Sequence, residues 1–250
     1  MLWQGDGASR LKTPAILIMP GFDHKDRRKL SLLLKKGSLS PVLDYLSSIP
    51  PKKVIGTLIR SFYHPEGLER WIAIRAFGYV VDRLAQKDME EARIVMRRLM
   101  WSLNDESGGI GWGAPEAMAE AMAQNETLAR EYSRILLSYV WEEGNFLEYL
   151  PLRRGALWGL YRLAKARTGI FREIEAWKIL KNYLSDRDAE SKALAILALG
   201  YSGVRELCDD IASNLSDRRI VKVFLEDELK EISIADLAAI SLDRLSCKDQ

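Results

Sequence analysis

The most unusual local sequence is WSLNDESGGIGWGAPEAMAE, residues 101–120, which combines glycines, carboxylates and two tryptophans. Glycine lets backbone N–H groups approach an anion closely, and a helix that begins near Pro115 would add its free N–H groups. Trp112 can stack on a flat ligand. A phosphate loop usually follows a strand and carries a lysine, whereas this segment follows a helical pattern and has no GKS or GKT. We therefore expect either a recognition loop or a packed inter-helix connection, with the loop candidates Asp105, Glu106, Gly108, Gly109 and Gly111.

A second set of candidate residues combines tryptophans with charged side chains on successive helical segments. Trp71 and Trp112 each stand five residues before a recurring alanine, which predicts that they lie side by side, whereas Trp158 stands two residues after Ala156 and is expected on a different face. Aromatic and arginine side chains on one surface can bind a peptide or a nucleic-acid backbone, and the alternative role of each tryptophan is core packing. The predicted partner-binding residues are Trp71, Arg75, Trp112, Glu116, Arg154 and Trp158. Trp101, Trp141 and Trp177 are expected on outer helices, with side chains packed in the hydrophobic core.

Groups for other chemistry are sparse. His24 and His64 are 40 residues apart in expected surface turns, which disfavours a histidine-based metal centre or triad. Cys208 and Cys247 show no CxxC spacing, so they suggest neither a disulfide framework nor a zinc site and fit a reducing cytoplasm. We predict no catalytic residues, no metal and no cofactor.

The elements that would position these residues follow a repeat. Helix-like segments carry an alanine in a similar setting at separations of 41, 39, 37 and 45 residues, namely Ala76, Ala117, Ala156, Ala193 and Ala238. A period near forty is typical of stacked helix pairs, because one helical hairpin cannot bury its apolar face without neighbours. The small side chain is expected to let the two helices of a pair approach closely.

The repeat predicts an all-α fold with one continuous domain. Residues 1–22 lack a sustained period and are expected to form an N-terminal arm, whereas residues 23–250 form the repeat domain. Near its end, Val221, Val223 and Leu225 alternate before a short polar break, and Ile232 and Ile234 alternate after it. This pattern predicts a small β-hairpin near 219–234 with a closing helix near 235–245. The competing interpretation is a continuous helix.

Composition agrees with a soluble globular protein. Of the 250 residues, 48% are hydrophobic, and the early apolar run AILIM, 15–19, is too short to span a membrane. Net charge is +2, but residues 1–100 contain 18 Lys and Arg against 10 Asp and Glu, and the remainder contains 19 against 25. This asymmetry favours solvated helix faces, with an anionic partner as the alternative. We expect an unexported, cytoplasmic protein with no membrane association.

The chain resembles the HEAT-repeat family of α-solenoids over roughly residues 50–245. Acidic turn residues recur at Asp105, Glu142 and Asp186, and a basic residue precedes the small one at Arg75, Arg154 and Lys192. Glu116 stands where a basic residue is expected, and Gly155 intervenes between Arg154 and Ala156. The resemblance implies a right-handed α-α superhelix.

The resemblance also implies a function class, since such solenoids commonly serve as scaffolds. The leading interpretation is a non-catalytic scaffold that binds a protein partner on its concave inner-helix face. The first alternative is nucleic-acid binding, because some HEAT-like solenoids are DNA glycosylases for alkylated bases that use aromatics and a carboxylate. This chain is similar in kind, with Trp101, Asp105, Glu106 and Trp112, but no stretch matches that active-site motif. The third is an accessory subunit for enzyme maturation or cofactor attachment.

Overall fold

The computed structural model describes residues 22–63, 67–103 and 111–247. The first part of the chain forms, in order, α1 (His24–Lys35), α2 (Leu39–Ser47), α3 (Pro51–Ser61), α4 (Leu68–Lys87), α5 (Met89–Leu103), α6 (Ala114–Gln124) and α7 (Glu126–Ser138). The rest forms α8 (Leu150–Ala166), α9 (Thr168–Glu173), α10 (Ala176–Leu180), the 3-10 segments η1 (Lys181–Ser185) and η2 (Arg205–Leu207), α11 (Ala189–Gly200), α12 (Cys208–Ala212), β1 (Ile220–Leu225), β2 (Glu228–Ser233) and α13 (Ile234–Leu245). None of these described helices is both long and apolar enough to cross a membrane.

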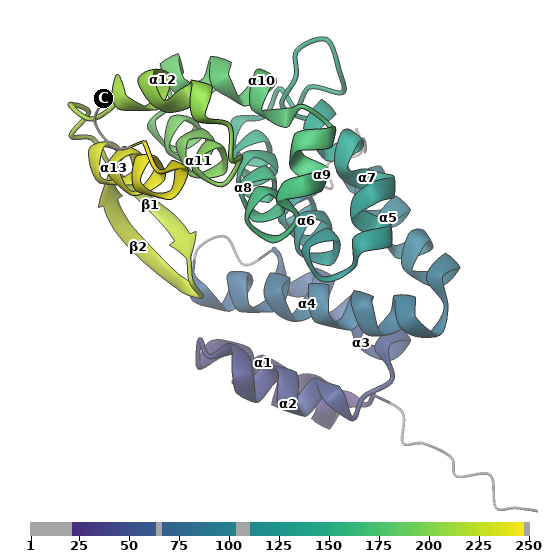
Figure 1. The fold of residues 1–250 in the computed structure, drawn as a ribbon. Helices are drawn as coiled ribbons and strands as arrows, with labels where there is room; N and C mark the ends of the chain where they lie inside the picture. The colour runs from purple at the N-terminus through teal and green to yellow at the C-terminus, as the bar shows by residue number, and fades with distance from the viewer. Residues whose placement is uncertain (1–21, 64–66, 104–110, 248–250) are drawn as a thin grey trace, which may run out of the picture.

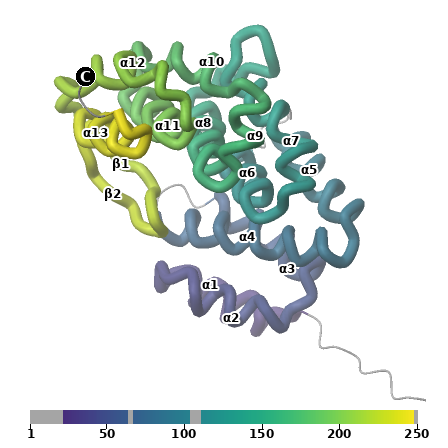
Figure 2. Tube along the Cα trace, in the orientation of Figure 1, coloured from purple at the N-terminus to yellow at the C-terminus, as the bar shows by residue number. Residues whose placement is uncertain are grey.

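The helices form two layers of a solenoid (Figure 1). The inner layer consists of α4, α6, α8, α11 and α13, each packed against the next, and α5, α7, α9, α10 and α12 cover it from outside. Figure 2 shows how the chain alternates between these layers while it advances along the stack. One recurring alanine lies on each inner helix, and all are fully buried: Ala76, Ala117, Ala156, Ala193 and Ala238. The predicted α-α superhelix with a small C-terminal hairpin is confirmed.

Two glycines lie where inner helices of successive repeats approach each other closely. A Cβ atom added at Gly78 on α4 would lie 2.5 Å from the Glu120 side chain on α6. A Cβ atom added at Gly155 on α8 would lie 2.7 Å from the Glu116 carboxylate. At Gly78 the added atom would also lie 2.9 Å from the Glu120 backbone, so a larger residue there would push α4 and α6 apart. At Gly155 it would displace the Glu116 carboxylate.

At the N-terminal end of the solenoid, the helix pair α1 and α2 packs on α4. The Asp23 side chain accepts hydrogen bonds from the backbone N–H groups of Lys25 and Asp26, and the Asp26 carboxylate accepts from the Asp23 N–H. This capping box satisfies N–H groups that the first turn of a helix leaves free. Leu30 and Leu34 are buried, while the basic residues of α1 face solvent.

The outer element of the fourth repeat is divided into the short segments α9, α10 and η1. Glu175 adopts φ 54°, a left-handed conformation that ends α9 and starts the short α10 in a new direction. The chain then tightens into η1 before α11 begins at an Asp188 cap.

The C-terminal hairpin forms as predicted, with α13 beginning at Ile234 after a Ser233 cap. β1 and β2 pair antiparallel, from Ile220 opposite Ser233 to Leu225 opposite Glu228. The two turn residues, Glu226 and Asp227, have φ 50° and 63°. Positive φ at both central residues is the geometry that matches the twist of a two-residue hairpin. The strands pack on α11 and α13, and the tip extends beyond them toward α4 (Figure 1).

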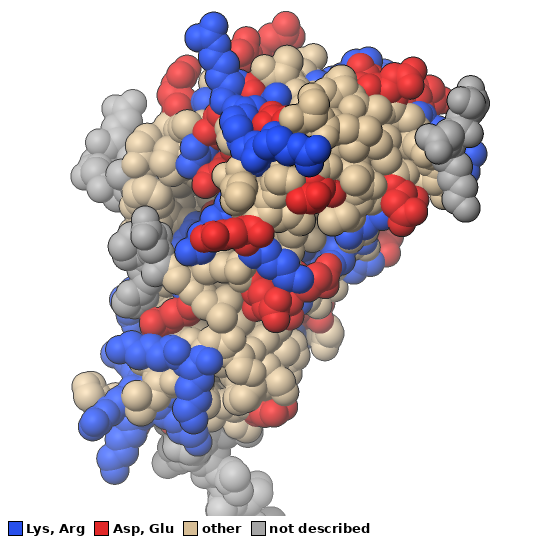
Figure 3. Space-filling model, turned by 90° about the vertical axis from the view of Figure 1, so that its left-hand side faces the viewer, with Lys and Arg blue, Asp and Glu red and all other residues tan. Residues whose placement is uncertain are grey.

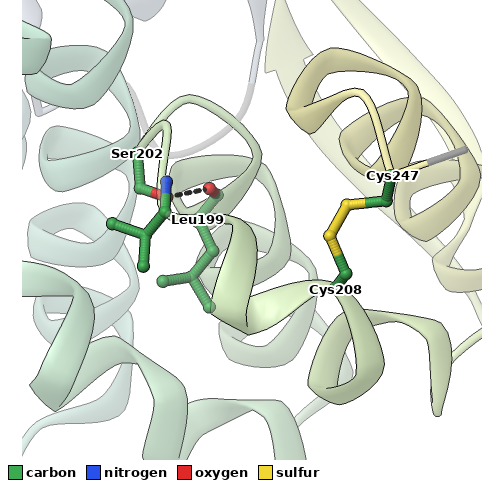
Figure 4. The surroundings of a disulfide bond; sticks show 5 residues. Leu199, Ser202, Cys208 and Cys247 are labelled. Atoms are coloured by element: carbon green, nitrogen blue, oxygen red, sulfur yellow. Dashed lines mark hydrogen bonds between the residues drawn. A yellow bond between two sulfur atoms is a disulfide. The ribbon is translucent and has the colours of Figure 1, made fainter.

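The expectation of two unpaired cysteines is wrong. Cys208 at the start of α12 and Cys247 just after α13 form a disulfide with a Cα–Cα distance of 6.0 Å (Figure 4). Their sequence separation of 39 is close to one repeat period, so neighbouring elements of the stack bring them together. Disulfides are typical of oxidising compartments and of intracellular proteins of hyperthermophiles, so the cysteines do not favour a reducing cytoplasm.

Candidate functional site

A cavity of about 480 Å³ lies between the hairpin and the inner helices α4, α6 and α8. Its volume falls within the range of sites that hold small molecules or side chains of a partner. Five of the six predicted partner-binding residues line it: Trp71, Trp112, Glu116, Arg154 and Trp158. The hairpin contributes residues that the sequence analysis did not assign to a binding site, namely Lys222, Val223, Phe224 and Leu229.

Arg75, the sixth predicted residue, lies one turn beyond Trp71 on α4 and outside the cavity lining. Its guanidinium is 3.3 Å from the Glu120 carboxylate and 3.4 Å from that of Asp227 at the hairpin tip. Glu120 is fully buried and also accepts a hydrogen bond of 2.6 Å from the Arg162 guanidinium. Arg75 therefore joins two inner helices and the hairpin through ion pairs.

The placement of Trp158 on a different face from Trp71 is wrong. The Trp71 ring centroid lies 4.8 Å from that of Trp158, and the Trp71 ring stacks on Phe224 at 4.7 Å with an interplanar angle of 4°. Positions five before and two after an anchoring alanine differ by seven residues, which is close to two helical turns and therefore one face. The Trp158 indole N–H also donates to the Phe224 carbonyl at 3.0 Å.

Glu116 places a carboxylate in this cavity, and the residue is only 3% exposed. Oε1 accepts a hydrogen bond from the Arg70 guanidinium, whereas Oε2 is buried with no hydrogen-bond partner among the described residues. Gly155 on the facing helix α8 provides the space that the carboxylate occupies. The two departures noted in the repeat pattern, Glu116 and Gly155, are thus in contact with each other.

Arg154 is held at the rim by two carboxylates. Its Nε donates to Asp188 at 2.9 Å, a second N–H donates to the other Asp188 oxygen, and Nη1 lies 2.7 Å from Glu190. Burial tends to raise the pKa of Asp188, but hydrogen bonds from Arg154 and Ser191 outweigh it and lower the pKa to about 2. The Asp188 hydrogen bond in turn raises the pKa of Arg154.

The hairpin tip is fixed by charge as well as by the aromatic stack. Glu226 forms an ion pair with Lys165 on α8, and a hydrogen bond from Lys165 lowers the pKa of Glu226. With the Asp227–Arg75 pair, the two turn carboxylates contact two different inner helices. The alternating pattern predicted the hairpin but not its contacts, because no local signal shows how far a strand pair reaches across a solenoid.

The predicted loop site is only partly within the described residues. Asp105, Glu106, Gly108 and Gly109 lie outside them. Gly111 is buried, and a Cβ atom there would lie 2.7 Å from the Ser102 carbonyl oxygen, so this glycine serves close packing. The expectation that Trp101 and Trp141 belong to the core is wrong, since they are 73% and 40% exposed. Trp177 is partly buried against the core.

Three arginines at or near the cavity are paired with carboxylates. Arg70, Arg75 and Arg154 each contact a carboxylate. Figure 3, which views the molecule from the left-hand side of Figure 1, shows basic and acidic side chains interleaved over its upper part and a basic group at its lower end. Exposed Lys25, Arg27, Arg28 and Lys29 on α1 account for basic surface at the N-terminal end.

Among the described residues no group of three or more His, Cys, Asp or Glu side chains could hold a metal ion.

Comparison with known proteins identifies the fold. No protein-family model matches the chain. A protein of Archaeoglobus fulgidus, described only as uncharacterized, is 29% identical over 196 residues, which cover 77% of this chain and 95% of that protein.

Among solved structures, a designed armadillo repeat protein in complex with the peptide (KR)4 matches with a TM-score of 0.53 at 15% identity, covering 88% of this chain and 92% of that one. A second designed armadillo repeat protein matches with a TM-score of 0.51 at 16% identity over 89% and 94% of the two chains. An engineered protein gives 0.53 at 12% identity over 89% and 90%. These likenesses, at low identity, show a helical-repeat solenoid fold.

Proposed function

We propose that this chain is a non-catalytic scaffold of the HEAT-like kind, with residues 23–250 as one repeat domain, and that it binds a segment of a protein partner in the inner-face cavity. The observation that carries the proposal is that Trp71, Trp112, Glu116, Arg154 and Trp158 line one cavity although they come from distant parts of the sequence. Aromatic and arginine side chains are enriched where binding energy concentrates in protein interfaces.

Two further observations support a protein segment as the occupant. A designed solenoid of similar fold is described in complex with a peptide, which supports a peptide segment as the occupant. The arginines at the cavity are already paired with carboxylates, which leaves little free positive charge for a phosphate backbone.

The proposal is tested by selecting ligands from a displayed random-peptide library on the wild-type protein. The dissociation constant of an enriched peptide is then measured for Trp112→Ala and for Trp101→Ala. Trp101 is the matched control, because it is an exposed tryptophan on the outer helix α5, away from the cavity lining. We expect Trp112→Ala to weaken binding by about tenfold or more, the effect of truncating an aromatic anchor, and Trp101→Ala to leave it unchanged.

Thermal melting of both variants shows whether they retain the fold. Failure of the library to yield any saturable ligand would contradict the proposal. Enriched peptides that bind folded Trp112→Ala as tightly as wild type would contradict the cavity as their site.

A further inference from the structure

The cavity holds a buried acceptor that the chain does not satisfy. Glu116 as a whole residue is 3% exposed. Its Oε1 accepts a hydrogen bond from the Arg70 guanidinium, whereas its Oε2 has no hydrogen-bond donor among the described residues. A buried carboxylate oxygen without a donor is unfavourable, and a group that supplies an N–H recovers that loss. The site therefore favours a ligand that donates hydrogen bonds.

Among the described residues, no other charged group of the cavity is hydrogen-bonded to Oε2. The facing surface of α8 is Gly155, which has no side chain, and its Cβ position lies 2.7 Å from Oε2. Arg154 already contacts Asp188 and Glu190, and Arg70 contacts Oε1. Lys222, the remaining cation of the lining, is exposed on β1.

The walls suit a long apolar stem that ends in a cationic group. Leu152, Leu194, Val223 and Leu229 line the cavity with the three indoles. Arginine and lysine have methylene stems that pack on apolar surface, and their charged ends are attracted to aromatic faces. Stacking of this kind already occurs at the edge of the site, where the Arg70 guanidinium lies 4.9 Å from the Trp71 ring centroid.

We propose that the cavity receives a lysine or arginine side chain of the partner segment and that its terminal N–H groups donate to Oε2 of Glu116. This inference rests on the proposed function and specifies the chemistry of the bound segment. Glu116 is then the residue that selects a basic side chain, and Trp112 and Trp158 enclose its stem.

The test uses three acetylated and amidated octapeptides: alternating Lys-Arg, a neutral counterpart with Gln for Lys and citrulline for Arg, and alternating Glu-Asp. Their dissociation constants are measured by calorimetry on wild type, Glu116→Gln and Glu190→Gln. Glu190→Gln is the matched control, since Glu190 also lines the cavity but already contacts Arg154. Both variants remove one negative charge, so non-specific attraction of the basic peptide changes equally.

We expect wild type to bind the Lys-Arg peptide at least tenfold more tightly than either other peptide. Glu116→Gln should lose at least tenfold in affinity for the Lys-Arg peptide, and Glu190→Gln less than threefold. Glutamine retains an oxygen for Arg70, and the comparison of peptides on wild type needs no variant. N-acetylarginine amide is titrated as well, because binding as tight as that of the peptide would assign the cavity to a free small molecule.

Equal affinity for the basic and neutral peptides, equal effects of the two variants, or no saturable binding of the Lys-Arg peptide would overturn the inference. The library selection separates this failure from that of the proposed function. Enriched peptides that require Trp112 but contain no lysine or arginine would retain the scaffold and remove the basic side chain.

Discussion

At the scale of single residues, buried carboxylates join the inner helices. Glu116 and Glu120 lie one turn apart on α6, and both are almost completely buried. Glu120 forms ion pairs with arginines of both neighbouring helices, Arg75 on α4 and Arg162 on α8. Within the described part of the chain, Glu116 pairs with Arg70 alone. The satisfied carboxylate links three inner helices, and the unsatisfied one faces the cavity. This difference separates a structural glutamate from a candidate binding glutamate.

The ionised carboxylate of Asp188 makes a contribution to the free energy of unfolding that depends on pH. Its folded-state pKa is about 2 against an ordinary 3.8, so its stabilising contribution is complete above about pH 4 and is lost as pH falls through 2. We expect Asp188→Asn to lower the free energy of unfolding at pH 7 by about 2 kcal/mol, because asparagine still caps α11 but loses the ionic bond to Arg154. Urea unfolding at several pH values from 7 to 2 measures this difference.

The same titration contains its own control. The difference in unfolding free energy between wild type and Asp188→Asn should shrink as pH falls from 4 to 2, since the protonated aspartic acid resembles asparagine. A difference that stays constant over this range would show that the substitution acts through packing or capping rather than charge.

Glu116 shows how far residue types alone can predict a site. The sequence shows that Glu116 breaks the pattern of basic residues and that Gly155 interrupts its own motif, but it does not show that the two residues touch. That contact depends on the offset between α6 and α8, which arises from packing of the whole stack. The prediction for Trp158 was wrong for a different reason. The offsets of Trp71 and Trp158 from their anchoring alanines differ by seven residues, and this difference had to be compared with the helical period.

At the scale of elements, the β-hairpin forms a wall of the cavity and also connects repeats that are distant in sequence. Its turn uses Glu226 and Asp227 where glycine or asparagine relieves positive φ most readily. Both carboxylates contact basic residues on inner helices, Lys165 and Arg75. These ion pairs give a physical reason for charged residues at strained turn positions.

Phe224→Ala tests the hairpin as a packed element. Phe224 is 2% exposed and stacks on Trp71, so its truncation should cost about 3 kcal/mol of unfolding free energy and shift tryptophan emission to the red. Ile220→Ala on the same strand is the control, because Ile220 is 69% exposed and its loss should cost less than about 0.5 kcal/mol. Urea unfolding followed by fluorescence measures both effects. Similar losses for the two variants would mean that the tip does not pack on α4 in solution.

At the scale of the whole molecule, the repeat period predicts the stack of helix pairs but not the contact between the C-terminal hairpin and α4. A spacing near forty residues reports that each helix pair contacts the next, and the five anchoring alanines indeed mark the five inner helices. Contacts between Trp71 and Phe224, or between Cys208 and Cys247, depend on the course of the chain after the last repeats. The hairpin thereby connects the last part of the solenoid to α4 and forms one wall of the cavity between them.

The central claim is that a protein segment binds in this cavity, and fluorine NMR of protein labelled with 5-fluorotryptophan tests it most directly. The chain has seven tryptophans, whose resonances can be assigned with single Trp→Phe variants. On saturation with a library-enriched peptide, the resonances of Trp71, Trp112 and Trp158 should shift, while those of Trp101 and Trp177 outside the cavity stay in place. Unmoved cavity resonances at saturation, or shifts confined to Trp101 and Trp177, would contradict the account.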